Sequence, residues 1–299
     1  METKYIVGVD AGGSKTRLRF AARDGATVKD VTHPAGDWTN EDARGKARLI
    51  AARIREVTSL PPAAVGIGAH GCDSDAECAR LRAEAEAELG VPVRVVNDAF
   101  LLAEAVPEGG PCVSLVVGTG SIAVARQAAG GGSLYAGGWG WLVGDPGSAW
   151  GTVRRAVQAL SETENRTGHA DGDPLLPALL AASGTGSLRE VVGLMQRTPA
   201  RQWAGWAPAV FDAAEAGSPA GLAALRGGAA DLVALVGDLL ARGADARRVV
   251  AGGSVIAGRP SLATRVASGL LAAHGLPLTV FDGDPVAGAV LLARRTPVR

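Results

Sequence analysis

The chain of 299 residues is poor in cysteine and balanced in charge, and both facts exclude whole classes of protein. Its three cysteines, Cys72, Cys78 and Cys112, are too few and too unevenly spaced for a disulfide framework or a CxxC metal site, so we expect a reducing cytoplasm. Thirty Lys and Arg balance thirty Asp and Glu, so neither nucleic acid nor an acidic membrane surface is favoured, and small molecules are the expected partners.

Long hydrophobic runs are also absent from the printed sequence. No apolar run reaches the roughly 18 residues of a membrane span, and the first residues lead into a predicted strand without an apolar leader. We therefore expect a soluble protein.

What the chain does contain is an alternation of apolar runs typical of an α/β fold. We expect strands near 5–9, 16–22, 64–68, 93–96, 112–117, 122–127, 249–251 and 279–281, and helices over 41–57, 75–89 and 99–106, with the remainder mainly helical. Asn40 is the expected N-cap of the first helix. A turn-rich break at 107–111 divides the chain into domains 1–109 and 110–299, and each half opens with a strand pair. This order predicts a duplicated fold with a cleft between the halves.

Three glycine-rich turns follow short apolar runs, at Gly12-Gly13, Gly118-Thr119-Gly120 and Gly252-Gly253. Glycine tolerates positive φ and has no Cβ, so backbone N–H groups in such turns are free to converge on an anion. One turn of this kind is a weak signal. Three in this order indicate a site that transfers a nucleotide phosphate.

Asp10 comes at the end of the first strand, directly before the first glycine turn. A carboxylate beside a phosphate site is explained by Mg²⁺, bound directly or through water, or else by a side chain that caps a turn. Lys15 and Arg17 would offset phosphate charge, although Arg17 reads more readily as a solvated edge residue. In the second turn, Thr119 and Ser121 add hydroxyls suited to a phosphate, or serve turn geometry alone.

Asp98 ends a predicted strand and begins a predicted helix. Its carboxylate either caps the helix or points into the cleft at the carboxyl end of the sheet. In a phosphotransferase it would orient an acceptor hydroxyl and take its proton.

The segment 137–151 is rich in glycine but also holds three tryptophans and a carboxylate. Aromatic faces beside a carboxylate suit a sugar ring, which has an apolar face and hydroxyls. The other reading is a tight structural loop packed by tryptophan, although Asp145 within it requires a partner.

At this point the chain resembles a known family. The segments GVDAGGSKTR (8–17), VNDA (96–99), VGTGS (117–121), GGWGWLVGDPGSAWG (137–151), AGGS (251–254) and DPVAGAVLLA (284–293) are similar to those of N-acetylglucosamine and glucosamine kinases. These kinases fall in the BadF/BadG/BcrA/BcrD group of the actin, hexokinase and Hsp70-like ATPase superfamily. The resemblance spans nearly the whole chain.

The resemblance implies a two-domain, duplicated ribonuclease H-like fold of the actin/hexokinase type, with the last helix packed back on the N-terminal domain. It implies a homodimer and transfer of the γ-phosphoryl group of ATP to the 6-hydroxyl of an amino sugar. Carried over by position, Asp10 helps to place Mg²⁺ and Asp98 is the catalytic base. The implied ATP-binding residues are Gly12, Gly13, Ser14, Lys15, Thr119, Gly120, Ser121, Gly228, Gly252 and Gly253, and the implied sugar-binding residues are Asn40, Asp98, Gly138, Trp139 and Asp145.

Two departures from the family pattern stand out. Pro146 replaces an acidic residue or Gln, and His70 occupies a position where small residues are usual; we expect His70 to be packed and hydrogen-bonded. The alternative function is an ATP-hydrolysing activator of a BadF-type dehydratase, whose iron–sulfur cluster needs paired cysteines at a spacing that this chain lacks. A sugar-sensing repressor would need a helix-turn-helix, for which four residues before the first strand leave no room. Whether the sugar is N-acetylated stays open.

Overall fold

A computed structural model describes residues 5–36, 38–106 and 110–297. The chain forms two compact units. The first consists of Met1–Ser114, Ala129–Ser133 and Gly283–Arg299, and the second of Leu115–Ala128 and Leu134–Asp282. The predicted break at 107–111 lies partly outside the described residues, and the unit boundary follows Ser114.

The sheet of the first unit has the strand order β3-β2-β1-β4-β5. The antiparallel part consists of β1 (Tyr5–Ala11), β2 (Lys15–Ala22) and β3 (Thr27–Pro34), and the parallel part adds β4 (Val65–Ala69) and β5 (Val93–Val96). Because β1, β4 and β5 are parallel, their carboxyl ends meet at one edge of the sheet, where Asp10 and Asp98 lie.

The helices of this unit are α1 (Ala43–Arg55), α2 (Asp75–Leu89), α3 (Phe100–Ala105) and α12 (Val286–Arg294). The prediction for α2 is confirmed at both ends, since Ser74 caps its start and Gly90 ends it in the left-handed conformation. The prediction of Asn40 as the cap of the first helix is wrong. The helix begins at Ala43, and Asp42 accepts a hydrogen bond from the amide of Gly45 at 2.8 Å.

The strand β3 was not expected from the sequence. Its side chains alternate only weakly between apolar and polar, and most of them are exposed at the sheet edge, so it lacks the apolar pattern that marks a buried strand.

Successive residues of β1 face opposite sides of the sheet. Val7, Val9 and Ala11 belong to the core that α1 and α2 cover, whereas Ile6 packs with residues of α12. Helix α12, from the end of the chain, thus completes the core of the first unit.

The second sheet has the order β10-β9-β6-β7-β8, which repeats the order of the first when the strands are numbered within each half. Its strands are β6 (Val113–Val117), β7 (Ser121–Arg126), β8 (Ser133–Gly137), β9 (Val249–Gly252) and β10 (Leu278–Val280). This repetition confirms the predicted duplicated α/β fold.

The second unit is mainly helical outside its sheet. Its helices are α4 (Ala149–Thr167), α5 (Leu175–Ser183), α6 (Leu188–Arg197), α7 (Ala200–Ala204), α8 (Ala207–Glu215), α9 (Pro219–Ala241), α10 (Ser254–Gly258) and α11 (Pro260–His274). Contrary to the expectation of no membrane-length apolar stretch, α9 is long and apolar enough to cross a membrane. It packs against α4, α8, α11 and β7, as a core helix does.

Candidate active site

The first glycine turn joins β1 to β2 in the first unit. Gly12 donates a hydrogen bond to the carbonyl of Lys15 at 3.0 Å, and Ser14 and Lys15 are exposed at the tip. Neither Gly12 nor Gly13 has a positive φ, so backbone freedom is not the reason for glycine here. A Cβ on Gly13 would lie 3.2 Å from Nε2 of His70, which makes close approach the reason.

Asp10 lies at the end of β1, opposite Arg17 on β2 and Gly68 on β4. Burial raises its pKa to about 7, with further contributions from the nearby charges of Asp98 and Asp284, while Lys15 and Arg17 act in the opposite direction. A carboxylate held among other carboxylates is destabilised unless a cation joins it. This environment suits the first of the two readings, in which Asp10 faces a metal ion.

The sequence suggested that Arg17 is a solvated edge residue, and this prediction is wrong. Its guanidinium pairs with Asp284 at 2.5 Å and with Asp30 at 3.3 Å, and Arg19 binds the same two carboxylates. These pairs tie the start of α12 to β2 and β3.

Asp98 follows β5 and is partly buried, with 26% of its side chain exposed. Burial raises its pKa, and the neighbouring His70 works against that shift. Asp98 is not the side-chain cap of α3, because α3 has no side-chain cap hydrogen bond, although the amides of Ala99 and Asp98 do interact with its carboxylate. Asn97 accepts a hydrogen bond from the amide of Ala99 at 2.9 Å and donates one to the carbonyl of Cys72 at 3.2 Å, which holds the loop.

His70 directly follows β4 and lies beside both Asp98 and the first glycine turn. Its Nδ1 lies 3.8 Å from Oδ2 of Asp98, and about half of its side chain is exposed, so the prediction of a packed histidine is wrong. The main chain of His70 is held firmly, since its amide donates to Ala11 and its carbonyl accepts from the indole of buried Trp38 at 3.1 Å. Asn40 is exposed in the turn that follows Trp38.

In the second unit the other two glycine turns are neighbours. A Cβ on Gly253 would lie 2.6 Å from the carbonyl oxygen of Val117, and Gly253 adopts a φ of 107°, so both close approach and backbone conformation require glycine there. Gly118 donates to the carbonyl of Gly120 at 2.9 Å, closing the turn around Thr119. The two turns therefore lie side by side, next to Ser121, whose hydroxyl donates a hydrogen bond to the carbonyl of Pro146 at 2.7 Å.

Asp145 organises the loop between β8 and α4. It is 3% exposed and has a φ of 56°, which is unusual for a residue with a side chain. The indole of Trp150 donates to its carboxylate at 2.8 Å, and so do the amides of Ser121 and Gly140. Burial raises its pKa, and these hydrogen bonds oppose the rise.

The tip of this loop is apolar and open to solvent. Trp139 is 77% exposed, Leu142 and Val143 are nearly as open, and Gly138 before them has a φ of 73°. The loop therefore presents an indole on a framework held by Asp145.

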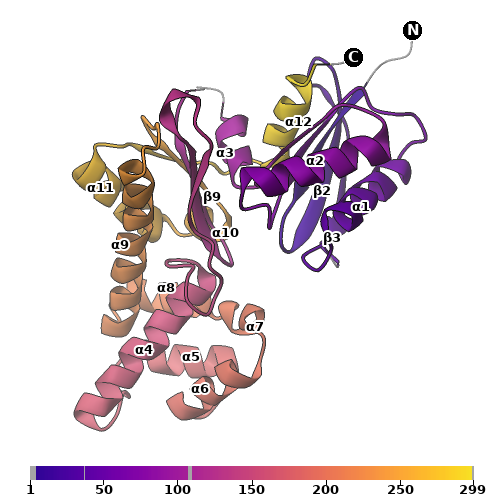
Figure 1. The fold of residues 1–299 in the computed structure, drawn as a ribbon. Coiled ribbons are helices and arrows are strands. Elements are labelled where there is room, and N and C mark those ends of the chain that lie inside the picture. Colours follow the sequence, from indigo (N-terminus) through magenta and orange to yellow (C-terminus); the bar gives the residue numbers. More distant parts are fainter. Residues whose placement is uncertain (1–4, 37, 107–109, 298–299) are drawn as a thin grey trace. The chain divides into compact units, whose positions relative to one another are not determined.

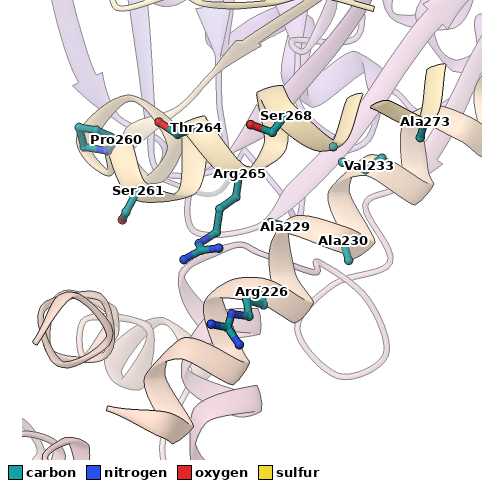
Figure 2. A pocket seen from close by; sticks show the side chains of 11 residues that line it. Arg226, Ala229, Ala230, Val233, Pro260, Ser261, Thr264, Arg265, Ser268 and Ala273 are labelled. Atoms are coloured by element: carbon teal, nitrogen blue, oxygen red, sulfur yellow. The ribbon is translucent and has the colours of Figure 1, made fainter. Parts of the chain in front are cut away.

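Gly228 lies within α9, and a Cβ there would lie 2.9 Å from the Cα of Gly147. The next residue, Ala229, lines a groove of about 870 Å³ between α9 and α11. Figure 2 shows Arg226 of α9 and Arg265 of α11 extending into this groove. Along the chain, the third glycine turn at Gly252-Gly253 is followed by the short helix α10 and then by α11, which lines this groove.

Comparison with known proteins agrees with the resemblance seen in the sequence. A curated N-acetylmuramic acid/N-acetylglucosamine kinase from Clostridium acetobutylicum is 28% identical over 173 residues, 55% of this chain and 56% of that protein. The match thus spans about half the length of the curated relative. No family model matches the chain.

Among solved structures, a protein from Chromobacterium violaceum described as an N-acetylglucosamine kinase has a TM-score of 0.74 and 26% identity, over 97% of this chain and 98% of that one. The fold is that of a sugar kinase. A structure from Porphyromonas gingivalis with the same description (TM-score 0.68, 18% identity, 97% and 98% covered) shares the fold. So does a ROK family glucokinase from Streptomyces griseus in complex with glucose and AMPPNP (0.57, 19%, 98% and 99%).

Proposed function

We propose that the protein is an ATP-dependent kinase that transfers the γ-phosphoryl group to the 6-hydroxyl of an amino sugar, N-acetylglucosamine or glucosamine. One observation carries the proposal. Asp10 and Asp98 lie at the carboxyl edge of one sheet, close enough for the charge of Asp98 to raise the pKa of Asp10, and Asp10 directly precedes the first glycine turn. Two carboxylates with separate environments suit the two separate tasks of a phosphotransferase.

Asp98 is the catalytic base of this proposal. It accepts the proton of the sugar hydroxyl while the hydroxyl oxygen forms a bond to the γ-phosphorus, and the bond between that phosphorus and the bridging oxygen of ADP breaks. Partial burial makes Asp98 a stronger base, because it raises the pKa of the carboxyl.

Asp10 fits a Mg²⁺ ion that arrives with the nucleotide. No group of three His, Cys, Asp or Glu side chains suited to a metal occurs among the described residues, and magnesium in phosphoryl transfer commonly uses one or two carboxylates with phosphate and water. When bound, the ion would neutralise phosphate charge. The partly buried, cation-seeking carboxylate of Asp10 is the group that would hold it.

The remaining residues divide by their local structure. We assign phosphate binding to the backbone of Gly12, Gly13, Thr119 and Gly120 with the side chains of Ser14, Lys15 and Ser121, and we assign the nucleoside to Gly252, Gly253 and α9 near Gly228. For the sugar we propose Asn40, Gly138, Trp139 and Asp145. Three donors already use most of the acceptor capacity of Asp145, so its main contribution is to hold the loop that presents Trp139.

The test is an ADP-release assay over N-acetylglucosamine, glucosamine, N-acetylmuramic acid, N-acetylmannosamine and glucose. We expect ADP release that depends on one of the amino sugars and on Mg²⁺, and a product phosphorylated at the 6-oxygen by NMR. ADP release without any sugar dependence would instead favour an ATP-hydrolysing activator. No release above background with any sugar would refute the kinase proposal.

We further propose that the protein is located in the cytoplasm and forms a homodimer. Trp203 and Trp206 are buried within the second unit, so their side chains do not offer a dimer surface. Light scattering on the purified protein will measure the oligomeric state directly.

A further inference from the structure

His70 lies between the two functional features of the first unit. On one side, its Nδ1 is 3.8 Å from Oδ2 of Asp98. On the other, the edge that carries Nε2 closes on the backbone of Gly13, where an added Cβ would lie only 3.2 Å away. One ring thus adjoins both the candidate base and the first phosphate turn.

The main chain around His70 fixes the position of this ring. The amide of His70 donates to the carbonyl of Ala11 at 2.8 Å, and Trp38 holds its carbonyl. Neither bond uses the imidazole. The exposed ring is therefore not needed to hold the loop, and both of its nitrogens are available for other groups.

The charged groups around His70 come from three parts of the first unit. Asp98 follows β5, Asp73 lies in the loop after β4, and Lys46 belongs to α1 and approaches Gly71. Nδ1 of His70 is the ring nitrogen that faces Asp98, and the imidazole lowers the pKa of Asp98 against the influence of burial.

We propose that His70 is a positioning residue of the transfer reaction. In its protonated form, Nδ1 faces the carboxylate of Asp98 and keeps that base ionised, while Nε2 faces the phosphoryl group held at the first glycine turn. The inference rests on the proposed kinase function and adds a residue to the proposed site.

Gly13 and His70 form a matched pair in this arrangement. A side chain on Gly13 would displace the ring from the turn, and a small residue in place of His70 would remove the imidazole from that side of the turn. The absence of a side chain on Gly13 therefore leaves room for the ring of His70 as well as for a phosphate group.

The test compares His70→Gln with the wild type and with His169→Gln, an exposed histidine of the second unit. For His70→Gln we expect kcat to fall by roughly 100-fold, the lower end of the effect of removing one preorganised donor. The KM for the sugar should stay within about twofold, because the sugar itself is not contacted. His169→Gln should behave as the wild type.

The pH profile of kcat/KM separates a positioning role from a structural one. Without the cation, the pKa of Asp98 rises, so the acidic limb of the profile should move to higher pH in His70→Gln. An unchanged kcat with an unchanged acidic limb would overturn the inference, as would an effect confined to the KM for the sugar. If His70→Gln fails to fold by circular dichroism, His70→Asn takes its place with the same criteria.

The two proposals fail in different ways. If the wild type phosphorylates none of the sugars, the proposed function is wrong. If the wild type is active and His70→Gln matches it, the kinase proposal stands and the role of His70 is refuted.

Discussion

At the scale of single residues, Asp10 and Asp98 lie at the same edge of one sheet but have different charged neighbours. Burial raises the pKa of both. Only Asp98 has His70 beside it to favour the ionised form, whereas Asp10 faces two further carboxylates and the cations Lys15 and Arg17. The first environment suits a base, and the second suits a metal ion.

Replacing the base tests the first assignment. Asp98→Asn keeps the shape of the side chain but cannot accept a proton, so we expect kcat for sugar phosphorylation to fall by about 10² to 10⁴. The affinity for ADP, measured by calorimetry, should stay near that of the wild type because the phosphate turns are untouched. Turnover close to the wild-type value would show that another group is the base.

The raised pKa of Asp10 predicts how the free energy of unfolding depends on pH. Its pKa is raised from 3.8 to about 7 on folding, so the native state binds the extra proton and loses stability as pH rises between these values. Asp10→Asn removes this penalty. At pH 8 we expect the free energy of unfolding to increase by about 1 to 3 kcal/mol, and at pH 4 to change little.

Asp24→Asn is the matched control, because Asp24 is exposed in a turn of the same unit and Asn preserves its bond to Ala26. Melting curves from pH 4 to 8 should show no pH-dependent gain for this variant. If Asp10→Asn lowers Tm at pH 8, the burial of an uncompensated charge is not the dominant effect. The same variant should lose Mg²⁺-dependent activity.

At the scale of elements, the contact between α12 and the first sheet depends on glycine. A Cβ on Gly8 would lie 2.5 Å from the amide nitrogen of Val290, and one on Gly66 would lie 2.1 Å from the carbonyl oxygen of Ala289. Gly288 meets Leu101 of α3 in the same way. The backbone of α12 thus rests directly on β1 and β4, which no larger residue would permit.

Gly66→Ala should therefore be disruptive despite its small size. The clash is with backbone rather than with a flexible side chain, so we expect a loss of about 2 to 3 kcal/mol in the free energy of unfolding. Gly258→Ala is the control, since nothing lies within 4 Å of its Cβ position and its φ is ordinary. Equal urea midpoints for the two variants would contradict this account.

At the scale of the whole molecule, the chain leaves the first unit and returns to it. The two sheets share one strand order, and the segment Gly283–Arg299 brings α12 back to the core formed by the first 114 residues. Val286, Ala289, Val290, Leu292 and Ala293 are buried by this return.

Removing the returning segment should unfold the first unit selectively. A chain that ends at Asp282 would expose the face of β1 and β4 that α12 covers, and we expect proteolysis to degrade the first unit and leave a resistant fragment of the second. A chain that ends at Pro297 should resist as the wild type does. Equal resistance of both truncated chains would show that α12 is dispensable.

The sequence predicted those elements whose ends carry local chemistry. Helix α2 is predicted to the residue because Ser74 and Gly90 mark its limits. The start of α1 was placed too early, because Asn40 and Asp42 are both capping residues and only the packing of the helix chooses between them. The strand β3 was missed because an exposed edge strand is held by its neighbour's hydrogen bonds rather than by an apolar pattern of its own.

The sequence by itself determined the duplicated α/β order, the three glycine turns and the two carboxylates Asp10 and Asp98, because these depend on neighbours along the chain. Only the tertiary structure decided which side chains meet. It placed His70 between Gly13 and Asp98, paired Arg17 with Asp284 and enclosed Asp145 within its own loop. Such contacts join segments far apart in the sequence, and they form only when strands and helices pack their apolar faces together.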